Sequence, residues 1–205
     1  MLHLHIHPEN PQPRLIQQAV ERIRAGDVVV YPTDAAYAIG CQIGNKSAME
    51  RIAQIRALGA KHQYAIVCSD LSDIATYAKV DNSTYRLLKN NTPAVSTFIL
   101  PATSEVPRRL MHPKKKTIGL RIPTNPICQS LLKELGEPLL TSTLILPGQT
   151  DPLNDPYDIE MQLGKRIDVF VDGGFGGLHT TSIIDLSGEQ AVVVRRGLGD
   201  VSAFE

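Results

Sequence analysis

Short apolar segments alternate with amphipathic helical patterns along most of this chain, and this alternation limits the folds open to it. Residues 13–26 predict a helix, because Pro13 suits its first turn, its apolar residues share one face and Gly26 ends it. Further helical patterns lie at 71–78, 82–89 and 125–135, the last ended by Gly136, and Asn45 can cap another helix that follows it. Strands are predicted at or near residues 27–31, 64–68, 96–100, 117–123, 138–146, 167–171, 181–186 and 191–195. Some of the last strands follow one another directly, so the order predicts an α/β domain with a twisted, mixed sheet.

The length of 205 residues suits one large domain or two small ones, and the hydrophobic content of 42% is enough for a proper core. The sequence has no internal repeat and no low-complexity segment. We therefore predict one domain over residues 1–205. The loop 147–156 is rich in Pro, Asp and Asn, which is typical of a mobile lid or an insertion.

Charge and cysteine content limit the classes of function. The 21 basic and 21 acidic residues balance, so binding to nucleic acid or a membrane would depend on local charge. Cys41, Cys68 and Cys128 lack metal-like spacing and predict buried free thiols in a reducing compartment. The first residues lack the order of a signal peptide, and no segment approaches the roughly 20 apolar residues of a membrane span. We expect a soluble, cytoplasmic protein without a membrane partner.

The stretch VVVYPTDAAYAIG, residues 28–40, places Thr33 and Asp34 at the end of a predicted strand. Open α/β sheets bind ligands at the carboxyl ends of their strands. The small residues that follow leave room for a ligand, so the stretch predicts a pocket with the threonine hydroxyl directed into it. The alternative is a Pro-Thr-Asp turn whose side chains cap the next helix.

The stretch from Val106 to Lys133 is basic and contains no acidic residue. Such a surface suits the phosphates of a nucleotide or of an RNA backbone, and the alternative for the lysines is a solvated loop. Arg121 differs from the other cations because it lies inside an apolar strand, where an unpaired charge is costly. It should therefore meet an anion, either a carboxylate of the protein or one of a ligand. We expect the stretch 106–121 to line a concave surface. The candidate phosphate or RNA contacts before this strand are Arg108, Arg109, Lys114, Lys115 and Lys116.

Two weaker patterns remain. His3, His5 and His7 alternate and would share one strand face, but no cysteine or carboxylate lies near them in the sequence, so no metal site is expected. The glycines of VDGGFGG, residues 171–177, lack the Gly-Lys-Ser/Thr ending of a phosphate loop. They predict a turn that can form one wall of an active site.

Five segments in this order resemble the YrdC/YciO family, whose members include threonylcarbamoyl-AMP synthases. YPTDAAYAIG resembles its strand-turn signature, TIGLRIP its central strand, VDGG its late strand-turn, and TTSIIDL and VVVRRG its closing strands. The similarity covers nearly the whole chain and is closest to the YciO branch in HPENPQPRLIQQAV, LKNNTPAVSTFILPA and EVPRRL. It implies the YrdC/RibB-like fold, in which a twisted α/β sheet surrounds a large, concave, positively charged cavity.

The resemblance also implies a reaction. The synthases use ATP, with Mg²⁺, together with L-threonine and bicarbonate. The threonine amine is carboxylated, and the carbamate attacks the α-phosphate of ATP and releases pyrophosphate. The product, threonylcarbamoyl-AMP, enters a tRNA adenosine modification. By resemblance the nucleotide and the amino acid are this chain's small-molecule partners, and no structural metal is implied.

The resemblance assigns binding roles to seven residues but implies no catalytic residue. The residues implied for the threonine-like substrate are Thr33, Arg121 and Thr181. Arg121 would hold the carboxylate in the bidentate geometry that arginine favours. The residues implied for the nucleotide are Arg56, Thr117, Thr143 and Arg195.

Two positions differ from the synthase pattern. The synthases carry a Lys-x-Arg pair after the second helix, where this chain has Arg56 and Leu58. They also carry Ser-Ala-Asn after the strand at 138–142, where this chain reads Thr143-Leu144-Ile145. Each lost polar contact is worth roughly 1.5–3 kcal/mol, so the resemblance implies weak or altered activity.

Two hypotheses therefore stay open. The first is an enzyme of the threonylcarbamoyl-AMP synthase type, a nucleotidyltransferase, that is either a weak synthase or one with an altered substrate. In this hypothesis Arg56, Lys61 and His62 are the candidates to supply the missing charge. The second is a non-catalytic RNA-binding protein that binds tRNA or double-stranded RNA with the basic cavity. The sequence does not distinguish them.

Overall fold

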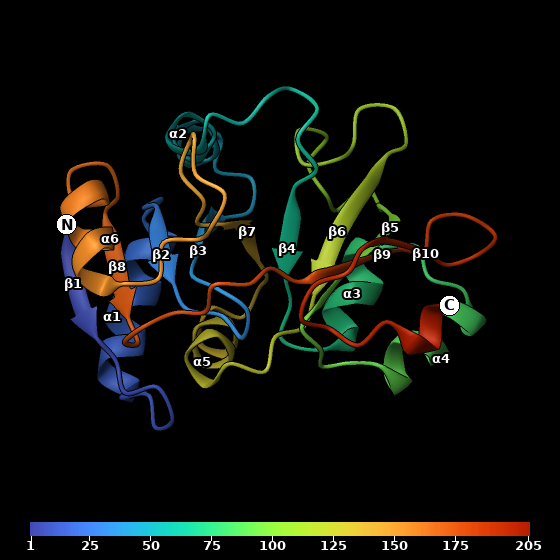
Figure 1. The fold of residues 1–205 in the computed structure, drawn as a ribbon, viewed down its shortest axis with the longest axis horizontal. Helices are drawn as coiled ribbons and strands as arrows, with labels where there is room; N and C mark the ends of the chain where they lie inside the picture. The colour runs from blue at the N-terminus through green and yellow to red at the C-terminus, as the bar shows by residue number, and fades with distance from the viewer.

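Ten short strands form one mixed sheet in the computed structural model, which describes residues 1–205 (Figure 1). The strands are β1 (Leu2–His5), β2 (Val29–Tyr31), β3 (Ala38–Gln42), β4 (Ala65–Val67), β5 (Ser96–Pro101), β6 (Thr117–Arg121), β7 (Leu139–Thr143), β8 (Val169–Asp172), β9 (Ser182–Asp185) and β10 (Val192–Arg195). The helices are α1 (Pro13–Arg24), α2 (Lys46–Arg56), α3 (Leu71–Tyr77), α4 (Asn82–Asn90), α5 (Pro126–Leu135) and α6 (Pro156–Leu163), followed by a short 3₁₀ turn, η1 (Ser202–Phe204).

The strand order across the sheet is β1-β8-β2-β3-β7-β4-β6-β5-β9-β10. Four neighbouring pairs are parallel (β1/β8, β2/β8, β4/β6 and β5/β9), and the other five are antiparallel. The two ends of the chain therefore lie near opposite edges of the sheet, beside β1 and beside β10 (Figure 1). The prediction of a single α/β domain with a mixed sheet is confirmed.

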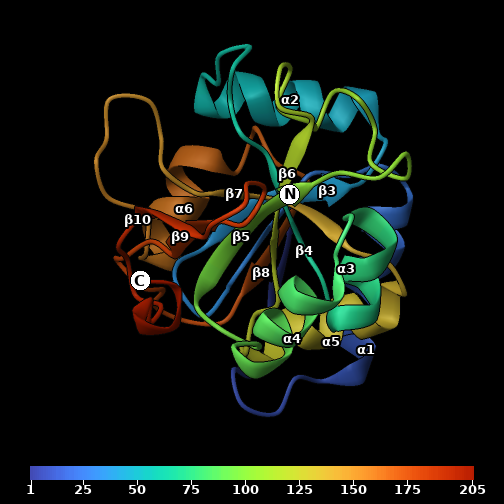
Figure 2. The same ribbon diagram turned by 90° about the vertical axis from the view of Figure 1, so that its right-hand side faces the viewer.

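Two apolar clusters hold the helices against the sheet. Buried residues of α1 and α5, such as Ile16 and Leu131, pack with Val29 of β2 and Val171 of β8. The larger cluster joins buried residues of α2, α3, α4 and α6 to buried residues of strands that include β5 and β6. Figure 2 shows α1, α3, α4 and α5 gathered at the lower right of the molecule and α2 at the top.

Local signals in the sequence fix several element ends. The Asn45 side chain accepts a hydrogen bond from the Ala48 N–H at 3.0 Å and so caps α2, as predicted. Gly26 and Gly136 have φ of +97° and +76°, the left-handed region that glycine adopts without steric cost, where the chain leaves α1 and α5. These ends of helices are confirmed.

Three elements were not among those predicted from the sequence: β1, β3 and α6. β3 lies in the small-residue stretch that we expected to leave room for a ligand, and it pairs with β2 and β7. A Cβ on its Gly40 would lie 2.1 Å from the Leu140 oxygen, so glycine permits the close approach of β3 and β7. The predicted lid, residues 147–156, runs into the first residue of α6, and the connection before α6 projects as a long loop at the left of Figure 2. Its mobility stays a prediction.

The three cysteines are free and buried, as expected, and burial raises the pKa of the Cys41 thiol to about 12. No helix combines the length and the apolar character needed to cross a bilayer.

Candidate functional site

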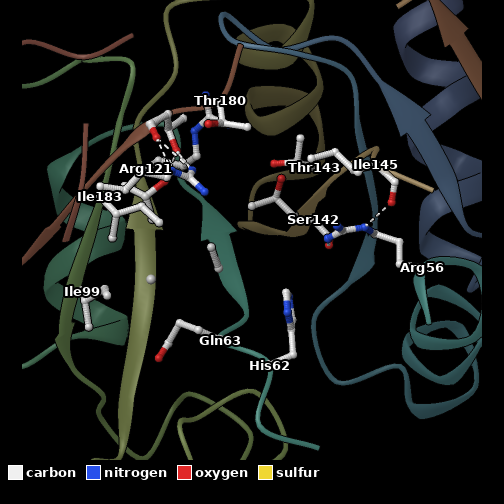
Figure 3. Close-up of a pocket in the computed structure, with 16 residues that line it drawn as sticks. Arg56, His62, Gln63, Ile99, Arg121, Ser142, Thr143, Ile145, Thr180 and Ile183 are labelled. Atoms are coloured by element: carbon white, nitrogen blue, oxygen red, sulfur yellow. Dashed lines mark hydrogen bonds between the residues drawn. The ribbon is translucent and has the colours of Figure 1, made fainter. Parts of the chain in front are cut away.

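A cavity of about 290 Å³ opens on one face of the central strands. Its walls come from β4, β5, β6, β7, β9 and β10, from the end of α2 and from the turn before β4. Figure 3 shows Arg56, Ser142 and Ile145 on one side and Arg121, Thr180 and Ile183 on the other. The volume is at the small end of the roughly 300–1,000 Å³ typical of ligand pockets.

Hydroxyl groups and cations dominate the lining of this cavity. Three arginines (Arg56, Arg121 and Arg195) line it, and no aspartate or glutamate does. The hydroxyl residues of the lining are Thr97, Thr141, Ser142, Thr143, Thr180 and Thr181. The lining therefore favours an anionic ligand that also accepts hydrogen bonds.

Arg121 reaches the cavity because β6 alternates. Gly119 and Arg121 line the cavity, whereas Leu120 packs in the core on the other side of the strand. Arg121 is 5% exposed, and its Nη2 donates a hydrogen bond to Oδ1 of Asp34. Asp34 Oδ2 accepts a second bond from the Thr124 N–H at 3.0 Å. The expectation that Arg121 meets an anion is confirmed, and the anion is a carboxylate of the protein.

The ion pair leaves part of the guanidinium without a partner. Arg121 Nε is buried and makes no hydrogen bond. Leaving a buried donor unpaired costs roughly 1–3 kcal/mol, and more for a charged group. A ligand acceptor would remove this cost. Beside it, a Cβ on Gly119 would lie 3.1 Å from both Ala65 Cβ and Thr97 Cγ2, so glycine keeps the cavity floor open.

The hydroxyl of Thr181 lies in a network beside Arg121. It is 2.9 Å from the Thr97 hydroxyl, and Arg195 donates to the Thr181 carbonyl through Nε at 3.0 Å and Nη2 at 2.8 Å. Burial lowers the pKa of the Arg195 guanidinium, which stays charged at neutral pH. The structure thus brings Arg121, Thr181 and Arg195 into one cavity, as the resemblance implied.

The opposite wall is built around Arg56, the last residue of α2. Its Nε donates to the Ile145 carbonyl at 3.1 Å, and its Nη1 donates to the Ser142 hydroxyl at 2.5 Å. Burial, and then the charge of Arg56, lowers the pKa of His62 to about 4. His62 is therefore neutral at pH 7, and Lys61 is exposed and does not line the cavity. Arg56 alone brings positive charge to this wall.

Two predicted site residues lie outside the cavity lining. The Thr33 hydroxyl donates to the Ala36 carbonyl at 2.6 Å and accepts from the Ala35 and Ala36 N–H groups. It therefore closes a local turn, and a strand rather than a helix follows. Thr117 is buried with an unpartnered hydroxyl but does not line the cavity.

The expectation that the basic stretch 106–121 lines a concave surface requires correction. Of its cations only Arg121 lines the cavity, because Arg108, Arg109, Lys114, Lys115 and Lys116 precede β6 and Arg121 ends it. Four residue steps along a strand span roughly 13 Å, so the two ends cannot share one small site. Two of these cations form ion pairs elsewhere: Arg109 Nη1 lies 3.7 Å from Glu50 Oε1, and Lys115 Nζ lies 3.9 Å from Asp185 Oδ2.

Several lining residues were not predicted. Thr97, Thr141 and Ser142 face the cavity from strands that were read only as buried segments. The sequence does contain one signal for such residues: hydroxyl residues at alternate positions of an apolar strand, such as Thr141 and Thr143 of β7, share one face of the strand. Gln63 and Thr180 lie in connecting segments, where no periodic pattern points to a cavity.

Comparison with known proteins places this fold in a family. The family model Sua5_yciO_yrdC, described as telomere recombination, matches residues 21–197. The chain belongs to the Sua5/YciO/YrdC family. The uncharacterised protein YciO of Escherichia coli K12 is 54% identical over 200 residues, which cover 98% of this chain and 97% of the relative. A threonylcarbamoyl-AMP synthase of Vibrio vulnificus is 28% identical over 172 residues, which cover 82% of this chain and 91% of that protein.

Solved structures of the Sua5/YciO/YrdC family share the fold. The crystal structure of E. coli YciO superposes with a TM-score of 0.96 at 52% identity and covers all of both chains. Sua5 of P. abyssi, crystallised with L-threonine, superposes with a TM-score of 0.87 at 22% identity. That match covers 96% of this chain and 58% of the Sua5 chain.

The two departures from the synthase pattern of this family lie differently around the cavity. Ile145 lines it directly and presents hydrocarbon where an amide was expected. Leu58 does not line it; its N–H bonds the Ala53 carbonyl at 2.9 Å in the turn that ends α2. Ile145 is therefore the departure in direct contact with the site.

Proposed function

We propose that this chain binds an α-amino acid and a nucleotide in the cavity, as a threonylcarbamoyl-AMP synthase-like protein with weakened nucleotide chemistry. The observation that carries the proposal is Arg121, a buried arginine with an unpartnered Nε in a cavity lined by no carboxylate. The distant similarity to a threonylcarbamoyl-AMP synthase supports the same class of reaction.

The amino acid would be held by its carboxylate. A guanidinium presents five N–H donors in a planar fork, and one Nη2 donor of Arg121 is taken by Asp34. The Nε–H and the second Nη2–H remain for a side-on carboxylate. The crystal structure of Sua5 with L-threonine supports threonine as the amino acid. The Thr181 hydroxyl, on the same side of the cavity, would bind a polar group of the same ligand.

The nucleotide would lie towards Arg56, Thr143 and Arg195. In the proposed reaction the carbamate of threonine attacks the α-phosphate of ATP, the bond to the β-phosphate breaks and pyrophosphate leaves. The two arginines would stabilise the charge that develops on the phosphate oxygens. Mg²⁺ binds oxygen ligands, and no carboxylate lines the cavity. The lining therefore suits Mg²⁺ only as an ion carried on the phosphates of ATP.

Thermal melting with L-threonine tests the amino-acid site. A ligand that binds only the folded state raises the melting temperature, so L-threonine should stabilise the wild type. Thr181→Val, which removes a cavity hydroxyl, should reduce this increment. Thr33→Val should lower the starting melting temperature and leave the increment unchanged, because the Thr33 hydroxyl is used within its own turn. Loss of the increment in Thr33→Val but not in Thr181→Val would contradict the assignment.

RNA binding is the second candidate function, and an exposed loop favours it. Arg108, Lys114 and Lys116 are exposed in the connection between β5 and β6 and form no ion pair within 4.0 Å. This loop, rather than the cavity, would contact the RNA backbone. With 5% aromatic residues and no tryptophan, base stacking is scarce, so the binding would be electrostatic.

Electrophoretic mobility of a duplex RNA probe tests this candidate. Affinity should fall steeply between about 50 and 200 mM salt, and Lys114→Glu with Lys116→Glu should weaken it further. Arg195→Gln, in the cavity, serves as the control and should leave RNA affinity unchanged. Salt-independent binding, or equal loss in the cavity variant, would contradict an electrostatic contact at this loop.

A further inference from the structure

Two histidines and one aspartate meet at the β1 edge of the sheet, outside the cavity. His3 Nε2 lies 2.8 Å from Asp172 Oδ2, and His5 Nδ1 lies 3.3 Å from the same oxygen. One potential ligand atom from each residue lies within 4.8 Å of the others. The alternating histidines are visible in the sequence, but the carboxylate is not, because 169 positions separate His3 from Asp172. We expected no metal site because no carboxylate lies near the histidines in the sequence, and the fold supplies one.

The topology creates this cluster. β1 pairs in parallel with β8, and the register sets His5 opposite Asp172 and His3 opposite Phe170. Alternation places His3 and His5 on one face of β1, with their rings stacked 4.3 Å apart. In Figure 1, β1, β8 and α6 lie side by side at the left of the molecule.

The aspartate is fixed while its second oxygen is directed to the imidazoles. Asp172 is 7% exposed, and its Oδ1 accepts a hydrogen bond from the Gly174 N–H at 2.8 Å. Oδ2 is therefore held beside both histidines. A buried carboxylate with one oxygen already bonded is preorganised, because it needs no rearrangement to act as a ligand.

A second carboxylate lies near the other ring nitrogen of His3, at an ion-pair distance rather than a hydrogen-bond distance. His3 Nδ1 lies 3.6 Å from Glu160 Oε2 in α6, on the side of the ring away from Asp172. Metal-binding histidines usually donate their other ring N–H to a carboxylate, which fixes the tautomer and raises ligand basicity. With the proton on Nδ1, Nε2 of His3 carries the lone pair, and a cation between Nε2 and Asp172 Oδ2 would replace the direct contact of 2.8 Å between these two atoms.

We propose that His3, His5 and Asp172 bind a divalent transition cation of the Zn²⁺ class. Two imidazole nitrogens and one carboxylate oxygen are suitable ligands for Zn²⁺, Co²⁺ or Ni²⁺. They do not suit Mg²⁺ or Ca²⁺, which prefer oxygen ligands only. The His5 side chain is 78% exposed, so water can complete the coordination. The bound cation would clamp the edge strand β1 to β8, and would act on stability rather than in the cavity.

Calorimetric titration with ZnCl₂ at pH 7.5, together with melting, tests the site. The wild type should bind one equivalent. At about 100 times the dissociation constant its melting temperature should rise by roughly 5–10 °C. MgCl₂ at the same concentration should produce no rise. Absence of one-to-one binding, or an equal rise with MgCl₂, would overturn the proposal.

Three variants locate the cation. His5→Ala removes an exposed ligand, and Asp172→Asn keeps the shape of the side chain; each should weaken Zn²⁺ binding roughly 100-fold or more, since changes to second-shell partners alone cost about 10–100-fold. His7→Ala is the matched control, because its Nδ1 already accepts the Glu9 and Asn10 N–H groups at 3.2 and 3.0 Å. Wild-type affinity in His5→Ala, or equal loss in His7→Ala, would overturn the assignment.

Discussion

Threonylcarbamoyl-AMP formation by this chain should be roughly 10²–10⁴ times slower than by a synthase such as the Vibrio vulnificus relative. Ile145 presents hydrocarbon to the cavity, and Leu58 leaves only Arg56 on that wall, so two charge-assisted or polar contacts are missing. Contacts that stabilise charge on the α-phosphate during adenylyl transfer act on the rate itself. The measurement is pyrophosphate release with ATP, L-threonine and bicarbonate under identical conditions.

Restoring the amide should recover part of this rate. Ile145→Asn should raise pyrophosphate release by about tenfold or more if the rest of the site is intact, and Leu58→Arg should add less, because Leu58 lies outside the lining. Ile183→Asn is the matched control: it places the same amide on the opposite wall and should give no gain (Figure 3). Efficient turnover by the wild type would contradict this explanation. It would mean that Arg56 alone provides the charge stabilisation that the arginine and the asparagine of the synthase pattern provide in the synthases.

Asp34→Ala should lower the free energy of unfolding by about 3–5 kcal/mol, because it leaves the charge of Arg121 buried without its partner. For a chain of this length the melting temperature should fall by roughly 6–20 °C. Urea unfolding followed by circular dichroism measures the change. In the double variant Asp34→Ala with Arg121→Met the buried charge is absent, so a large part of the loss should be recovered.

An exposed ion pair provides the control for this prediction. Glu50→Ala removes the partner of Arg109 on the surface, where such pairs contribute at most about 1 kcal/mol. An Asp34→Ala variant as stable as Glu50→Ala would show that the buried pair does not hold β6 to the turn after β2.

Much of the fold was predictable because it depends on local patterns. Apolar periodicity located most of the strands, and the Asn45 cap and the Gly136 helix end were visible as single residues. β3 was not predictable, because its small residues become a strand only through pairing with β2 and β7. α6 was hidden because Ile159 and Leu163 are its only buried residues, directly after a loop rich in Pro and Asp.

Site residues were predictable where the alternation of side chains within one strand determines which of them face the cavity. They were not predictable where two segments distant in the sequence meet. The strand pattern alone indicated that Arg121 would be buried and would need an anion. Its partner Asp34 lies 87 positions away, which no periodic pattern encodes. The prediction for the basic stretch failed because its cations are near one another in the sequence but lie at opposite ends of β6. The prediction that the Thr33 hydroxyl binds a ligand failed because a hydroxyl at a strand end can bond to its own turn as readily as to a ligand.

Binding of L-threonine, compared with L-threoninamide, tests the central claim most directly. The two compounds differ only in the group that Arg121 would hold, so the comparison needs no variant. In calorimetric titration of the wild type, L-threonine should bind, and L-threoninamide should bind at least about tenfold more weakly, as expected for the loss of a charge-assisted hydrogen bond. Equal affinity for both compounds, or no binding of L-threonine, would contradict a carboxylate site at Arg121.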